Sequence, residues 1–77
     1  MLIEYIDAAM GRAKVSPLKE TGGFYGEIPE CQGVWARAPT VDECKQALRE
    51  VLEGWIFVRI KKGLEIPIIK GHAFGII

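Results

Sequence analysis

Few side chains in this sequence are placed to do chemistry, and the acidic residues are the first to consider. Glu27 and Glu30 lie beside a predicted turn, where carboxylates could contribute to a metal site. A metal-dependent nuclease needs further carboxylates on neighbouring elements, and the first predicted strand, residues 13–18, carries none. His72 has no serine, cysteine or carboxylate at a known catalytic spacing. We therefore expect no catalytic residue, no metal, no cofactor and no enzyme activity.

The cysteines and glycines also lack a functional pattern. Cys31 and Cys44 have no second cysteine pair and no histidine near them, whereas zinc sites and disulfide frameworks need such companions. We expect free thiols that pack as small apolar side chains. Gly22, Gly23 and Gly26 are not followed by the lysine of a Gly-x-x-x-x-Gly-Lys phosphate loop. We interpret them as turn and strand glycines.

Length and charge favour a binding module. A domain of 77 residues buries only roughly 60% of the surface of its unfolded chain, so help from a second subunit is expected. We predict an obligate dimer or tetramer. Ten basic and ten acidic residues balance, so no overall positive field attracts nucleic acid. No apolar run approaches the roughly 20 residues of a membrane span, and the start lacks a signal-peptide pattern. We expect a cytoplasmic protein that does not bind membranes.

The elements that would position these residues follow from periodicity and turn signals. The pattern predicts a helix over residues 2–11, strands over residues 13–18, 24–28 and 33–38, a long helix that opens at Thr40, and a last strand over residues 65–69. Two glycines at 22–23 suit a hairpin turn. This order predicts a single two-layer α+β domain over residues 1–77: a short N-terminal helix, then βββ-α-β, with residues 70–77 as a tail.

The long helix carries the strongest local signal. Thr40 with Glu43 three residues later forms a capping box, and Gly63 suits the left-handed cap at the other end. Between these caps, apolar residues recur at spacings of three and four, which predicts the helix face that covers the sheet. That predicted stripe consists of Cys44, Ala47, Leu48, Val51, Leu52, Trp55 and Val58.

The segment from Ile28 to Glu43 reads Ile-Pro-x-x-x-Gly-x-x-Ala-x-x-x-Thr-x-x-Glu. It resembles the corresponding segment of the HicB-like antitoxins, small bacterial and archaeal proteins that neutralise the HicA ribonuclease toxin. Two positions depart from the usual pattern, because Gln32 replaces a common proline and Ala38-Pro39 replaces Gly-Asp. The resemblance implies a truncated ribonuclease-H-like fold, often assembled as dimers, in which a helix packs across a three-stranded meander and a fourth strand follows.

The same resemblance implies a function. It predicts an antitoxin of a type II toxin–antitoxin system, which binds and neutralises a HicA-type mRNA-cleaving toxin. The alternative is a stand-alone dimeric module of the same fold that binds a ligand or a protein without a toxin partner. Several family members carry a DNA-binding module after this domain, and only eight residues follow Ile69 here. We therefore expect no direct DNA binding from this chain alone, as in a short single-domain branch of the family.

Exposed aromatic residues mark candidate interfaces. Tyr25, Trp35 and Arg37 are predicted on the sheet face that the helix does not cover. They could stack on RNA bases, but with balanced charge we favour a subunit or partner contact.

The long helix has a second apolar side. Phe57 and Ile60 fall far from its core stripe, and Ile56 falls at the margin of that stripe. We expect a second subunit to cover Phe57 and Ile60 first, the N-terminal helix second and the toxin third.

Overall fold

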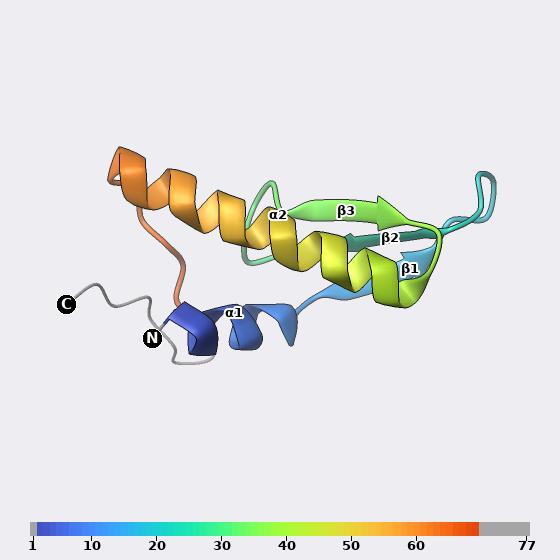
Figure 1. Ribbon diagram of the computed structural model, residues 1–77, viewed down its shortest axis with the longest axis horizontal. Coiled ribbons are helices and arrows are strands. Elements are labelled where there is room, and N and C mark those ends of the chain that lie inside the picture. Colours follow the sequence, from blue (N-terminus) through green and yellow to red (C-terminus); the bar gives the residue numbers. More distant parts are fainter. Residues whose placement is uncertain (1, 70–77) are drawn as a thin grey trace.

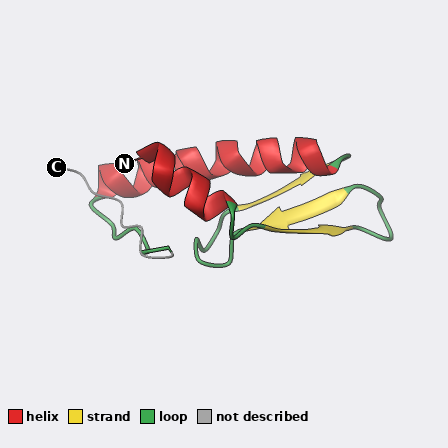
Figure 2. Cartoon of the chain, turned by 90° about the horizontal axis from the view of Figure 1, so that it is seen from below, coloured by secondary structure: helices red, strands yellow, loops and turns green. Residues whose placement is uncertain are grey.

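The computed structural model describes residues 2–69 (Figure 1). Within them the chain forms, in order, α1 (Leu2–Met10), β1 (Lys14–Pro17), β2 (Phe24–Glu27), β3 (Trp35–Ala38) and α2 (Val41–Lys62). The strands form one antiparallel sheet in the order β1-β2-β3, and the two helices form a layer on one face of it (Figure 2). The predicted two-layer α+β architecture is confirmed. Neither helix in the described part of the chain is long and apolar enough to cross a membrane.

Two glycines allow the sheet to form and the helix to approach it. Gly23 has a φ of 80°, and a Cβ there would lie 2.8 Å from the carbonyl oxygen of Ala38, so the β1–β2 turn requires glycine. Gly26 lies under α2, where a Cβ would meet the Cys44 sulfur at 3.0 Å. Both are turn and strand glycines, as expected. The close approach at Gly26 sets α2 directly on β2.

The register sorts the strand residues between two faces. Val15, Gly26 and Ala36 are aligned across the three strands on the face that α2 covers. The alternate positions, on the opposite face, form two rows across the sheet: Ser16, Tyr25 and Arg37, and Lys14, Glu27 and Trp35. The predicted alternation is therefore confirmed, and it leaves both of these rows outside the core.

Both predicted ends of the long helix are confirmed. Thr40 has an extended backbone, and its hydroxyl oxygen accepts a hydrogen bond of 3.1 Å from the backbone N–H of Glu43. The same hydroxyl donates to the Glu43 carboxylate at 3.0 Å. At the other end, Gly63 has a φ of 68°, and its N–H reaches the carbonyl oxygens of the last turn. Caps of both kinds stop α2 within a residue of the predicted bounds.

The core lies between α2, the sheet and α1. Its buried members are Tyr5, Ile6, Ala9, Ile28, Cys31, Val34, Ala36, Cys44, Leu48, Leu52, Ile56 and Ile69. Both cysteines are free thiols with no exposed surface, as predicted, and burial raises the pKa of Cys31. The predicted α2 stripe is wrong at three positions: Ile56 is buried, while Val51 and Val58 are exposed by 38% and 47%. The cause is α1, which packs on the Ile56 side of α2 and turns the core toward it.

The predicted last strand, Glu65–Ile69, is also wrong as a strand. Residues 64–68 have no regular structure, and Ile69 makes only an isolated bridge. Pro67 has no backbone N–H to offer a sheet, and its carbonyl oxygen instead accepts a 2.5 Å hydrogen bond from the Tyr5 hydroxyl. The segment therefore returns to α1 (Figure 1). The predicted tail, residues 70–77, lies outside the described residues.

The lengths of the elements explain the elongated shape, which measures 44 × 23 × 16 Å. A 22-residue helix is about 33 Å long, whereas strands of four residues span about 13 Å. The second half of α2 therefore extends past the sheet, and α1 lies beneath it (Figure 1). This half of α2 is covered by less protein than the first half.

Candidate protein-interaction surfaces

The outer face of the sheet presents an aromatic pair. The rings of Tyr25 on β2 and Trp35 on β3 stack with centroids 6.1 Å apart and an interplanar angle of 24°. Trp35 is 53% exposed. The Tyr25 hydroxyl donates to a Glu27 carboxylate oxygen at 3.2 Å, and desolvation together with Glu27 raises the Tyr25 pKa. Tyr25 thus stays a neutral donor, and it is held both by this hydrogen bond and by stacking on the indole.

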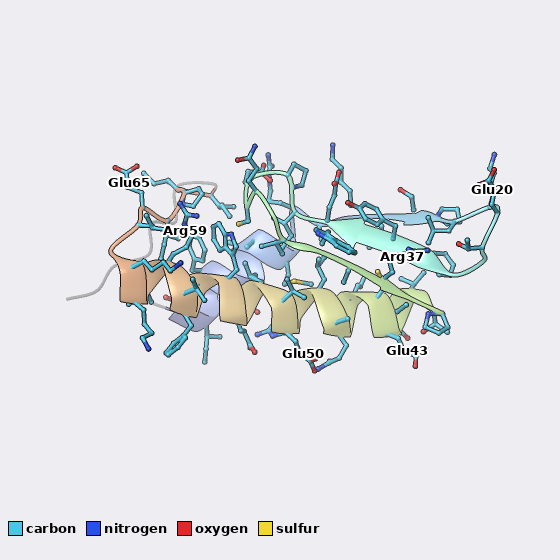
Figure 3. All side chains as sticks on the ribbon, turned by 90° about the horizontal axis from the view of Figure 1, so that it is seen from above. Glu20, Arg37, Glu43, Glu50, Arg59 and Glu65 are labelled. Atoms are coloured by element: carbon cyan, nitrogen blue, oxygen red, sulfur yellow. The ribbon has the colours of Figure 1, made fainter. Side chains whose placement is uncertain are left out.

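Arg37 lies beside this pair, at the edge of an open hollow of about 460 Å³. The hollow is lined by Leu18, Glu20, Thr21, Tyr25, Trp35 and Arg37. The guanidinium donates to the Thr21 hydroxyl at 3.4 Å, and Glu20 projects from the tip of the β1–β2 hairpin (Figure 3). Three of the residues predicted as an interface are therefore brought together. A flat apolar group with a nearby carboxylate would fit a surface of this kind.

A second hollow, of about 230 Å³, lies between α1 and the overhanging half of α2. Its lining residues are Ile6, Glu53, Ile56, Phe57 and Ile60. The N-terminal helix therefore does reach this side of α2, although Phe57 remains 61% exposed and Ile60 39% exposed. Cover by α1 is incomplete, and the expected subunit and toxin contacts stay predictions. Phe57 and Ile60 are on a different layer from Tyr25 and Trp35, so the five predicted residues form two surfaces.

Ion pairs connect α1 to α2 and to the turn that follows β2. Asp7 on α1 accepts from Arg49 on α2 at 3.1 Å, and Arg49 lies 3.8 Å from Glu53. At the end of α1, Arg12 contacts Glu30 at 2.6 Å, and this contact holds the pKa of the Glu30 carboxyl below its usual value. Exposed pairs of this kind contribute little each. The burial of Tyr5, Ile6 and Ala9 therefore does more than these pairs to place α1 beside the second hollow.

Sequence reasoning missed several residues that shape this end of the molecule. Tyr5 is 1% exposed and joins α1 to Pro67, whereas Ile3 on the same helix is 68% exposed. Trp55 donates its indole N–H to the carbonyl oxygen of Gln32 at 3.0 Å. The sequence signal for Tyr5 was its position one helical turn before Ala9, which places both side chains on the same face of α1.

Arg59 connects two segments at the C-terminal end of α2. Arg59 lies 4.8 Å from the centre of the Trp55 ring and donates to the Glu65 carbonyl oxygen at 2.6 Å (Figure 3). The aromatic ring and the last segment are thereby tied to the same guanidinium. Elsewhere, no three His, Cys, Asp or Glu side chains among residues 2–69 are grouped so that they could hold a metal ion.

The protein is a small α+β domain with two separate exposed surfaces, one around Tyr25 and Trp35 and one around Phe57 and Ile60. A family model described as UPF0150-like matches residues 4–67, and the chain belongs to this family. A search of curated proteins gives no match. Among solved structures, the crystal structure of TTHA0281 from Thermus thermophilus is similar, with a TM-score of 0.91 and 30% sequence identity. The alignment covers 99% of this chain and 94% of TTHA0281.

Proposed function

We propose that this protein is an antitoxin-like protein of a type II toxin–antitoxin system, which binds and neutralises a HicA-type mRNA-cleaving toxin. The observation that carries the proposal is the family match over residues 4–67, because the UPF0150-like family is associated with HicB-like toxin–antitoxin proteins. The HicB-like segment also performs a local structural role here. Gly33 takes the φ of 94° that its turn requires, and Thr40 caps α2.

The protein would neutralise the toxin by covering the toxin's RNA-binding surface and not by a chemical reaction. Tyr25, Trp35 and Arg37 are the residue types that contribute most to protein interfaces, and they lie together on one open face. A toxin docked there would bury the indole of Trp35 and could place a carboxylate against Arg37. The toxin surface beneath would then be closed to RNA.

Co-expression with the toxin-like reading frame next to this gene tests the proposal. The wild-type chain should restore growth and co-purify with that protein. The variant Trp35→Ala/Arg37→Ala should lose both effects, while Lys45→Ala, an exposed change on α2, should keep them. A neighbouring protein that is not toxic, or that fails to co-purify with the wild-type chain, contradicts the antitoxin function. Rescue that survives the double substitution places the toxin on another surface.

A second candidate is a stand-alone dimeric module that binds a ligand or protein without a toxin. The hollow of about 460 Å³ beside Tyr25 and Arg37 favours it, because the hollow combines apolar rings with a cation. A gene with no toxin-like neighbour, together with a folded dimer that binds aromatic carboxylates, would support this function over the first.

A further inference from the structure

One flank of α2 carries an apolar row that contacts the core only at its partly buried first member, Ala47. Ala47, Val51, Gly54 and Val58 recur at spacings of four, three and four, so they lie along one line of the helix. Val51 is 38% exposed, Val58 47%, and Gly54 is exposed as well. On a helical wheel this row lies on the side of α2 opposite to α1, and Phe57 lies about 90° from the centre of the row. The row is therefore distinct from the two surfaces described above.

Gly54 has no explanation within a single copy of the chain. It lies in the interior of a 22-residue helix, where glycine is among the least favourable residues. A Cβ built on Gly54 meets no heavy atom within 4 Å among the described residues, so nothing in them requires its absence. A glycine in such a row does allow another helix to approach closely. Exposed valines on both sides of Gly54 are thus a surface on which a helix of another protomer could pack closely.

We propose that this flank is a two-fold contact, on which α2 of a second copy of the chain packs antiparallel. The register that sets Val51 against the partner's Gly54 also sets Ala47 against the partner's Val58. Equal spacing from the axis makes the row complementary to itself, as a two-fold contact requires.

Charge supports the same occupant. In this register Glu43 of one copy comes opposite the partner's Lys61, and both lie on the same side of the row, so two ion pairs flank the contact. Figure 3 shows Glu43 on the outer side of α2, away from the sheet. Antiparallel α2 helices also bring opposite dipole ends together. A second copy therefore satisfies the charges as well as the shape of the row.

The variant Gly54→Leu tests the contact in the purified protein without any toxin. Within one protomer the new side chain enters open space and improves helix propensity, so the variant should be folded by circular dichroism. Across the two-fold axis it collides with the partner twice. We expect the mass of the assembly in sedimentation to fall by half, with a dissociation constant roughly a hundredfold higher. Gln46→Leu, an exposed change on another side of α2, should keep the wild-type mass.

A charge variant gives the second measurement. Glu43→Gln keeps a residue able to complete the capping box but removes the carboxylate. It should weaken association roughly threefold and reduce its dependence on salt, with an unchanged helix content by circular dichroism. Wild-type mass for Gly54→Leu, an unfolded Gly54→Leu, or a wild-type chain that stays monomeric at roughly 100 μM would each overturn the proposal. None of these outcomes depends on whether the protein is an antitoxin.

Discussion

Replacing Phe57 and Ile60 together by serine tests whether the hollow between α1 and α2 is a docking surface. Phe57 exposes 61% of its surface and Ile60 39%, and Ile6 of α1 covers only part of the hollow. Serine has nearly the same helix propensity as phenylalanine and isoleucine, so α2 itself should tolerate the change. The substitution therefore removes apolar surface without altering the helix. We expect weaker assembly and largely preserved secondary structure.

The exposed fractions give the size of the effect. The 61% of Phe57 that is free corresponds to about 120 Å², or about 3 kcal/mol at ~25 cal/mol per Å² if a partner covers it fully. Ile60 adds about 1 kcal/mol, and a total of about 4 kcal/mol weakens association roughly a thousandfold. The parts already covered within the protomer cost its fold about 2 kcal/mol. A chain of this size has about 4 to 12 kcal/mol of stability and should stay folded.

Light scattering on a dilution series, with circular dichroism at each concentration, separates the loss of association from the loss of protomer stability. Val41→Ser is the matched control, because Val41 is also an exposed apolar residue of α2 but lies at its opposite end. A double variant that keeps the wild-type mass and melting temperature would show that Phe57 and Ile60 are ordinary surface. A variant that unfolds as a dilute monomer would instead show that the hollow is part of the core.

Four further outcomes are expected. Thr40→Ala removes the hydroxyl that accepts from Glu43 and should cost about 1 kcal/mol, or about 4–8 °C in Tm, whereas Thr40→Asn should retain the cap. Tyr5→Phe removes the donor to the Pro67 carbonyl and should cost about 1–2 kcal/mol, with faster hydrogen exchange in residues 64–69. Burial raises the pKa of Tyr5 and of Cys31, so the stability these groups contribute is present at neutral pH and should fall as pH rises above about 8.5; a urea midpoint that is flat from about pH 8 to 11 would contradict this. The purified chain should neither cleave RNA nor bind its upstream DNA tightly, and salt-sensitive nanomolar binding in a gel-shift assay would contradict that prediction.

Local signals in the sequence predicted the parts of the fold that depend on neighbours along the chain. The turn at Gly23 and the cap at Thr40 each rest on residues a few positions apart, and both are confirmed. The errors concern contacts between distant segments. The Tyr5 hydroxyl meets Pro67 across 62 positions, and this contact replaces the predicted last strand. No periodicity within either segment specifies such a partner.

The candidate surfaces show the same division. Alternation along β2 and β3 was enough to put Tyr25 and Trp35 on one outer face. The helical wheel separated Phe57 from the core, but it could not say on which side of α2 the first helix would pack. Because α1 packs on the Ile56 side of α2, Val51 and Val58 are left exposed to solvent. The packing position of α1 therefore explains why two residues of the predicted core are exposed and form the apolar flank around Gly54.

The length of α2 links the scaffold to its binding surfaces. The sheet beneath it is short, so the second half of the helix is covered by α1, by residues 64–69 and, at Trp55, by the β2–β3 loop. Neither flank of that half can be buried completely by a chain of 77 residues. Phe57 is exposed on one flank and Val58 on the other, so two separate apolar surfaces lie on one helix. Two isologous contacts of this kind would close a tetramer with three two-fold axes. The outer face of the sheet would then remain free for a different partner.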